Sequence, residues 1–204
     1  MTLANFTELS AEINDWLDRD DLEDKIASFV RLFEARAFRE LRIREMLRRQ
    51  TATLAIGDRY AALPTGFRQM RQLRLFDGTG VHEVEEASSA LVTETYSPTA
   101  GLPKLFTVDG EIEFDRPAGK AYTMEMKFYA PLTGLSDANP TNGLLTRAPD
   151  AYLWGSLAAA SPWLENDSRI ATWDAGWTGA RDAMNAEDRA RGGRLVSRVR
   201  GATP

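Results

Sequence analysis

The side chains that could do chemistry are few and lie far apart along the chain. The sequence contains one histidine, His82, and no cysteine. Disulfides, thiolate metal sites and thiol nucleophiles are therefore excluded. His82 stands in a predicted strand between Val81 and Glu83, and neither a general base nor a zinc site works without partner groups that this stretch does not supply. We interpret His82 as a surface residue of that strand.

Two acidic segments could be taken for cation sites. Asp18–Asp24 resembles the start of a calcium loop, but an EF-hand needs glycine at its sixth position and glutamate at its twelfth. Those positions hold Glu23 and Phe29, so we interpret the segment as an interhelical turn that caps the next helix. The second segment alternates carboxylates on one predicted strand face, which we expect to be solvated because no other group is placed opposite it. Its members are Glu111, Glu113 and Asp115.

No cofactor motif is present. Asp77–Gly80 contains two glycines but lacks the Lys-Ser/Thr of a phosphate-binding loop and the glycine spacing of a dinucleotide fold, so it predicts a turn. No serine stands in a nucleophile-elbow context. We expect no cofactor, no metal and no enzymatic activity. The enzymatic alternative that stays open is a carboxylate-only metal site using Glu111 and Glu113.

Charge is unevenly divided between the two ends of the chain. The whole sequence has a net charge of −5, yet residues 1–24 hold eight carboxylates against Arg19 alone, a net charge of −7. Residues 189–204 hold five arginines and no acidic residue, a net charge of +5. Ends of opposite sign can steer one copy onto another, or onto a partner with a complementary surface. The alternative is a solvated acidic helix and a basic tail.

Arginines also follow one face of a long predicted helix and its continuation: Arg31, Arg36, Arg39, Arg42, Arg44, Arg48 and Arg49. A surface that neutralises several phosphates binds nucleic acid, so a nucleic-acid-binding module is one alternative function. Glu34, Glu40 and Glu45 lie three or four positions from these arginines. We therefore favour a salt-bridged helix or an intersubunit face.

Apolar periodicity divides the chain into three blocks. Residues of about 7–49 and 146–191 have helical periodicity, and residues of about 51–132 have strand periodicity. We expect Thr7 to cap a short first helix and Asp20 or Asp21 to cap the long second one. Each helical block has a single apolar stripe, so neither can be stable alone, and we expect the two blocks to pack together.

Several strands can be placed inside the central block. Residues 51–56 and 59–63 predict two strands joined at Gly57-Asp58, and Asp109-Gly110 predicts a two-residue hairpin turn. The clearest strand is 121–130, where apolar and polar residues alternate, so one face should lie in a core.

The expected fold class is α+β: a bundle of about four helices drawn from both ends of the chain, with an inserted antiparallel β-rich subdomain. The expected organisation is a bundle from 1–50 with 146–191, an insert at 51–132, a return loop at 133–145 and a basic arm at 192–204. No apolar run approaches the roughly 20 residues that span a bilayer. The acidic first residues do not resemble a signal peptide, so we expect synthesis in the cytoplasm.

Four segments resemble a known family. Residues 5–46 pair a short helix ending in Trp-Leu-Asp-Arg with a long helix containing Glu34-Ala35-Arg36, as tailed-phage head-to-tail adaptor proteins do. Thr51–Pro64, followed by Phe67 and Arg71-Gln72-Leu73, is similar to their first hairpin and the strand after it. Leu102-Pro103-Lys104 and Leu144–Gly155 are similar to two further segments, and the second of these is the most distinctive.

The resemblance implies a structural virion protein of the neck region. Such adaptors assemble as homo-oligomeric rings, typically of twelve copies, beneath the portal protein after DNA packaging. Their helical bundle forms the ring, they widen a channel through which DNA passes without sequence-specific binding, and they offer a platform to the next tail protein. Related proteins occur in prophages and gene transfer agents. A C-terminal arm commonly contacts the portal, and here its candidate residues are Arg191, Arg194, Leu195, Arg198, Val199 and Arg200.

The charge pattern suits that expectation, because unlike ends favour head-to-tail contacts that can close into a ring. We expect the channel wall to carry mixed charge, since a continuous basic stripe would hold DNA in place. The runner-up function is another neck or tail component, such as a tail terminator or a tube protein. Those proteins are dominated by sheet, so a low helix content would favour them.

Overall fold

The structure is a computed structural model that describes residues 3–164 and 167–191. The fold class is α+β, as expected. The chain divides into two compact units, and each is described by itself. Unit 1 takes the described residues up to Glu45 and those from Leu132 onward, and unit 2 comprises Met46–Pro131.

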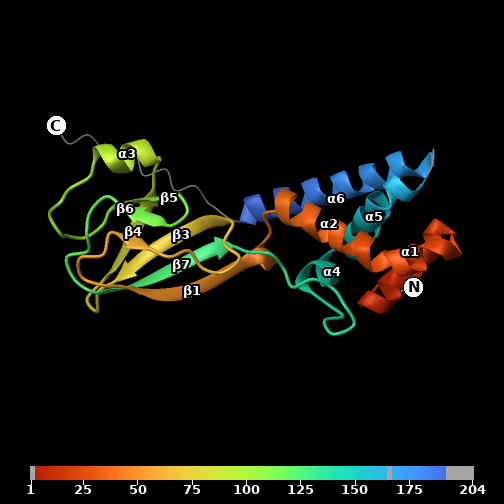
Figure 1. The fold of residues 1–204 in the computed structure, drawn as a ribbon, viewed down its shortest axis with the longest axis horizontal. Coiled ribbons are helices and arrows are strands. Elements are labelled where there is room, and N and C mark those ends of the chain that lie inside the picture. The colour runs from red at the N-terminus through yellow and green to blue at the C-terminus, as the bar shows by residue number, and fades with distance from the viewer. Residues whose placement is uncertain (1–2, 165–166, 192–204) are drawn as a thin grey trace. The chain divides into compact units, whose positions relative to one another are not determined.

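Unit 1 is helical (Figure 1). Its α-helices are α1 (Phe6–Leu17), α2 (Ile26–Glu40), α4 (Gly143–Arg147), α5 (Pro149–Ala159) and α6 (Arg169–Arg191). Short 3₁₀ turns are η1 (Asp20–Lys25), η2 (Arg44–Met46, which runs into unit 2) and η3 (Ser161–Trp163). Within the described ranges, none of the helices combines the length and apolarity needed to cross a membrane.

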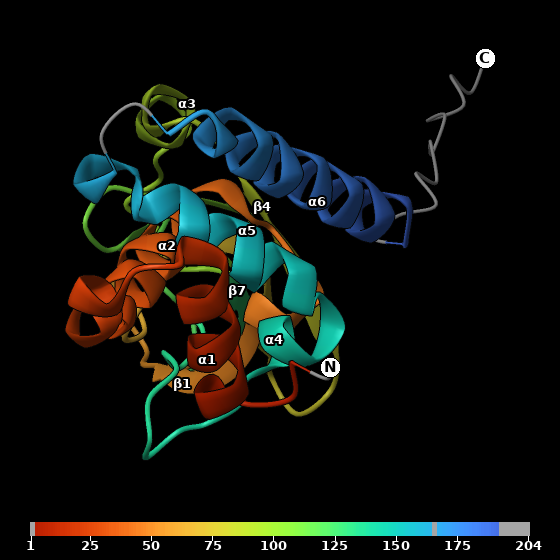
Figure 2. The ribbon, with the colours of Figure 1, turned by 90° about the vertical axis from the view of Figure 1, so that its right-hand side faces the viewer.

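Helix α5 is the centre of unit 1 because α1, α2 and α6 all pack against it. Figure 2 shows α5 between α1 and α6. Gly155 allows a close approach of α5 to α2, since a Cβ there would lie 2.0 Å from the Phe33 ring. Phe33 also makes edge-to-face contacts with Tyr152 and Trp177, at centroid distances of 5.0 and 4.8 Å. Helices from both ends of the chain thus share one apolar core.

Helices α2 and α6 run in the same direction, and polar pairs join them along their length. Asp174 pairs with Arg36 near the middle of α2, and Trp177 Nε1 donates to Glu40. Further along, Asn185 accepts from the backbone N–H of Arg42 and Asp188 accepts from that of Arg44. The C-terminal turns of α6 therefore lie at the C-terminal end of α2.

Unit 2 is a seven-stranded sheet with one short helix. The strands are β1 (Leu47–Leu54), β2 (Tyr60–Ala61), β3 (Gln69–Phe76), β4 (Val81–Glu86), β5 (Leu105–Val108), β6 (Ile112–Phe114) and β7 (Tyr122–Tyr129). Their order is β1-β7-β3-β4-β5-β6-β2. Helix α3 (Ser89–Glu94) begins at Ser88, whose side chain accepts from Leu91 N–H as expected of a cap.

The alternation in β7 was predicted correctly and places one face in the core. Tyr122, Met124, Met126 and Phe128 are all buried. They pack with residues from the neighbouring strands, among them Leu73 and Leu75 of β3. The Asp109-Gly110 hairpin is also confirmed, with β5 and β6 antiparallel and Gly110 at φ 85°.

Three expectations about the central block are wrong. β1 begins earlier, at Leu47, and it pairs with β7 rather than with β2, which instead pairs with β6. The 51–63 segment is therefore not a hairpin. The sheet is not wholly antiparallel either, because β4 and β5 are parallel. Their connection contains α3, and a crossover of this kind returns the chain in the same direction.

The helix boundaries also differ from expectation. Asn5, not Thr7, caps α1, because its side chain accepts from Glu8 N–H. No aspartate caps α2; residues 20–25 form the turn η1 and Lys25 precedes α2 without a side-chain cap. Helix α2 ends at Glu40, where Leu41 turns to extended backbone and buries its side chain. The short helix α4 was not anticipated; Asn142 caps it by accepting from Leu144 and Leu145 N–H.

Candidate interaction site

The predicted arginine face does not exist as one surface. Arg31, Arg36 and Arg39 lie on α2, Arg42 and Arg44 follow it, and Arg48 and Arg49 belong to β1. Three of the set are paired with carboxylates: Arg36 with Glu40 and Asp174, Arg44 with Glu45, and Arg49 with Glu125. Of the local salt bridges that the spacing suggested, Arg36–Glu40 on α2 is present, whereas Arg44 pairs with its sequence neighbour Glu45 and Glu34 accepts from Leu135 and Tyr152.

His82 is a partly exposed strand residue whose imidazole supports a turn. Its Nε2 lies 3.0 Å from Asp77 Oδ2, and Lys120 Nζ lies 2.7 Å from the same oxygen. Asp77 Oδ1 accepts from Thr79 and from Gly80 N–H, as in the turn predicted there. Hydrogen bonds from Lys120, Thr79 and His82 hold the pKa of Asp77 well below its usual range. The cluster fixes the β3–β4 connection.

The face that holds Glu113 and Asp115 is not uniformly solvated, contrary to expectation. Asp115 is 2% exposed and accepts hydrogen bonds from the backbone N–H groups of Lys104 and Leu105, while Arg116 pairs with it at 3.0 Å. Glu113 pairs with Arg59, whose guanidinium lies 4.0 Å from the centroid of the Tyr96 ring. Both carboxylates are therefore occupied in holding strands together.

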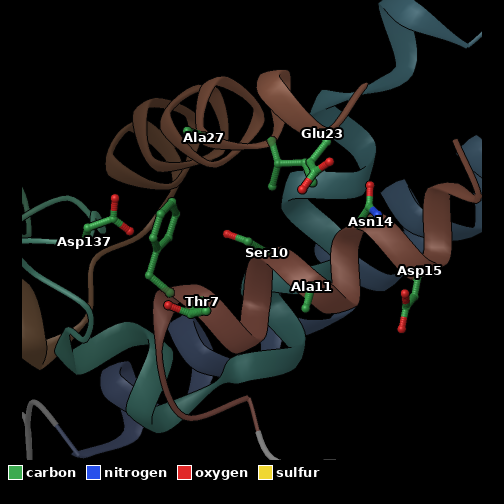
Figure 3. A pocket seen from close by; sticks show the side chains of 10 residues that line it. Thr7, Ser10, Ala11, Asn14, Asp15, Glu23, Ala27 and Asp137 are labelled. Carbon is green, nitrogen blue, oxygen red and sulfur yellow. The ribbon is translucent and has the colours of Figure 1, made fainter. Parts of the chain in front are cut away.

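A groove in unit 1 lies between α1 and the start of α2 (Figure 3). Its volume is about 590 Å³. It is lined by aliphatic, aromatic, polar and acidic side chains, and no lysine or arginine is among them: Phe6, Thr7, Ser10, Ala11, Asn14, Asp15, Glu23, Ile26, Ala27 and Asp137.

The acidic groove, as we call this set of residues, carries unpaired charge. Asp15, Glu23 and Asp137 make no ion pair with any described residue. Ser10 Oγ and Asn14 Oδ1 are buried and have no hydrogen-bond partner within the described part of the chain. Figure 3 shows both side chains on the side of α1 that faces Glu23. Buried polar atoms of this kind are normally satisfied, so the groove has bonding capacity to offer.

One wall of the acidic groove is the loop before α4, and it is held at two places. Leu135 N–H donates to Glu34 Oε1 at 2.7 Å, and Phe6 N–H donates to the Pro140 carbonyl at 2.7 Å. Tyr152 also donates to Glu34, at 3.0 Å. Burial raises the pKa of Glu34, although the hydrogen bonds from Leu135 and Tyr152 oppose the shift. Asp137 is thus presented by a loop fixed to both α1 and α2.

The remaining sequence candidates give no site of their own. Asp18 ends α1 with φ 53°, and Asp21 pairs with Arg19 beside it. No cluster of three or more His, Cys, Asp or Glu side chains suited to a metal ion occurs among the residues that the structure describes. Of the candidate portal-binding residues, Arg191 is the last residue of α6, and Arg194, Leu195, Arg198, Val199 and Arg200 lie outside the described residues.

Comparison with protein families shows which family the chain belongs to. The model of the SU10 adaptor protein family matches residues 4–200. The chain is a member of the SU10 adaptor protein family. No curated protein matches the chain. The match spans both units, so the helical unit and the sheet unit are both parts of the family's architecture.

Membership gives the chain a general role as a phage structural adaptor, a component of the virion that contacts other head or tail proteins. For such an adaptor we expect the functional residues to lie on the surfaces that contact other proteins. Sequence reasoning missed the acidic groove because its lining comes from three separate segments. The only sequence signal was the excess of carboxylates in residues 1–24, which supplies Asp15 and Glu23 but not Asp137.

Proposed function

We propose that copies of this chain form a ring that joins the portal to the tail and surrounds the DNA channel. The family match over residues 4–200 is the observation that carries the proposal. In this proposal the helices of unit 1 pack as a bundle and form the body of the ring. The ring contains twelve copies, as in the tailed-phage adaptors that the sequence resembles. The protein lies in the virion neck and has no catalytic role.

The contacts between copies would be head to tail. Most of the acidic groove is lined by residues 6–27, and the basic residues 189–204 form the last turn of α6 and the sequence after it. Surfaces of unlike charge on one subunit favour a heterologous contact, which closes into a ring when the rotation between copies allows it. The helices α2, α5 and α6 argue against the sheet-dominated tail terminator and tube proteins.

The portal contact is assigned to the C-terminal arm, with Arg194, Leu195, Arg198, Val199 and Arg200 as the residues that carry it. Basic side chains can steer the arm to an acidic portal surface, and the aliphatic ones would then be buried. The pairing of Arg36, Arg44 and Arg49 with carboxylates speaks against the nucleic-acid-binding alternative, since those guanidinium groups already have partners.

Negative-stain microscopy of the protein mixed with its portal tests the proposal. We expect an additional ring at one end of the portal, with density for about twelve copies. Replacing Arg194, Arg198 and Arg200 by glutamine should abolish the added ring at moderate salt, because three charges are removed from the arm. A portal that stays bare with the unmodified protein contradicts the proposal.

A further inference from the structure

The acidic groove has a shape and charge that call for a particular occupant. It offers apolar contact at Phe6, Ile26 and Ala27, and Glu23 and Asp137 are exposed at its rim. A ligand that fits must bring positive charge to the rim and aliphatic side chains to the interior. An extended segment that alternates arginine with Leu or Val meets both needs, because neighbouring side chains of an extended chain point in opposite directions.

The chain itself contains such a segment. Residues 194–200 read Arg-Leu-Val-Ser-Arg-Val-Arg and contain no acidic residue. In an extended chain the three arginines would share one side with Val196, and Leu195 and Val199 would lie on the other side with Ser197. Residues 194–200 lie outside the described residues, and Gly192 and Gly193 separate them in sequence from the end of α6. Guanidinium groups are strong donors to carboxylates such as Glu23 and Asp137 at the rim.

The place where this segment leaves unit 1 is far from the groove. Asn185 and Asp188 hold the end of α6 beside Arg42 and Arg44, which follow the C-terminal end of α2. The groove lies at the other end of α2, at Ile26 and Ala27. A 15-residue helix is roughly 22 Å long, so donor and acceptor are at opposite ends of the unit. That arrangement suits a contact from one copy to the next.

We propose that the acidic groove of each subunit binds residues 194–200 of the neighbouring subunit in a ring that has not yet met the portal. The inference rests on the proposed function, because it presumes that copies form a ring. It assigns the groove a partner of defined chemistry, a second copy of this chain. The portal would then compete for the same segment, so the contact would both join copies and shelter the arm until the portal is present.

Disulfide trapping in the full-length protein tests this arrangement, and the absence of native cysteine makes the reaction clean. Two single variants, Ala27→Cys in the groove and Val199→Cys in the arm, are mixed and oxidised without portal. We expect a covalent dimer joined between the two introduced cysteines, identified by peptide mass. The matched control pairs Val199→Cys with Ala175→Cys, which lies exposed on α6 and does not line the groove.

A second experiment changes the rim carboxylates, Glu23 and Asp137. Adding Glu23→Gln and Asp137→Asn to the groove variant should lower the dimer yield about fivefold, as two exposed charge pairs would. The matched charge control, Glu86→Gln with Glu94→Gln, removes the same number of exposed acids from unit 2 and should leave the yield unchanged. Portal binding of the rim variant should become tighter, because the weakened groove competes less for the arm, whereas a direct role of the rim in portal binding would weaken it.

Each other outcome overturns the inference. Light scattering first establishes that the preparation contains rings. If the yield of the Ala27→Cys/Val199→Cys dimer is then no higher than that of the Ala175→Cys control, the groove contact is ruled out and the proposed function still stands. The double variant Ala27→Cys/Val199→Cys should give a ladder of covalent oligomers; a cross-linked single chain instead would mean that the arm occupies its own groove. Protein that stays a single chain at every concentration and leaves the portal bare defeats both proposals.

Discussion

Glu34 is the residue on which the wall of the acidic groove depends. It stands on α2, and its carboxylate accepts from Leu135 N–H and from Tyr152. Tyr152 accepts in turn from Asn142, the cap of α4. Burial and the nearby Glu34 raise the pKa of Tyr152, so the phenol stays protonated and keeps donating. One carboxylate therefore ties the loop that carries Asp137 to the helices on both sides.

The raised pKa of Glu34 predicts a pH dependence of stability. Its ordinary pKa is 4.5, and burial raises the folded value. The folded protein then holds this proton more tightly than the unfolded chain, so its stability falls as pH rises from about 4.5 through the folded pKa and stays lower above it. Glu34→Gln keeps the shape but removes the titration. Its melting temperature relative to the native protein should therefore increase between pH 4 and pH 8; a difference that does not change with pH would contradict the assignment.

Local sequence could not reveal such residues because their partners come from distant segments. Asp115 looked like part of a solvated face, yet the β5–β6 pairing brings the N–H groups of Lys104 and Leu105 to it. Glu34 looked like one more salt-bridging residue of a helix, and its true partners are 101 and 118 residues away. The Asp77 turn was predictable because its glycines and aspartate interact within four residues.

The approach of α5 to α2 sets the packing of unit 1, and two glycines test it. Gly155→Ala should cost about 1–3 kcal/mol of unfolding free energy, because the added methyl group overlaps the Phe33 ring. Gly179→Ala, in exposed α6 with nothing within 4 Å, should instead gain about 0.5–1 kcal/mol from helix propensity. Chemical denaturation of both variants gives the comparison, and equal effects would show that α5 and α2 are not in close contact.

Arg147 joins α4 to both ends of the chain in a three-carboxylate cluster. Its guanidinium pairs with Glu45, Glu187 and Asp188 at 2.7–2.9 Å and is 13% exposed. Arg147→Ala should cost about 2–4 kcal/mol, because Asp188 would be left largely buried without a counter-charge and Glu45 would keep only the exposed Arg44. Arg44→Ala is the control from the same cluster: its side chain is 54% exposed, and its loss should be far smaller. Comparable losses would mean that the cluster is solvated.

Element types followed from periodicity, whereas strand partners did not. The alternation in β7 and the helical spacing of Phe29, Phe33, Trp173 and Trp177 predicted which faces are buried. Adjacent strands in sequence were expected to pair, as most do, but β1 pairs with β7 about 75 residues later in the chain. Nothing local in Leu47–Leu54 specifies that partner. The end of α2 was also missed, because arginines continue the helical charge pattern past Glu40.

At the scale of the whole molecule, the chain enters unit 2 through β1 and leaves it through β7, and these two strands pair with each other. β1 and β7 pair over eight residues, and Ala130 N–H donates to the Met46 carbonyl at 2.9 Å. Residues 46–131 expressed alone should therefore fold, with a cooperative thermal transition and a sheet-type circular dichroism spectrum. Residues 1–45 alone should not, since the apolar faces of α1 and α2 need α5 and α6. A folded 1–45 fragment or an unfolded 46–131 fragment would refute this division.

The pairing of α2 with α6 has a consequence for synthesis. Glu40 and Trp177 are hydrogen-bonded 137 residues apart, so a ribosome must add at least that many residues after Glu40 before α2 can meet its partner. Unit 2 is complete in sequence at Pro131 and can fold on the nascent chain, as domains commonly do during synthesis. Until α5 and α6 have been synthesised, Phe29 and Phe33 of α2 stay exposed to solvent. A polypeptide stalled before Trp173 would therefore expose this apolar surface to chaperones.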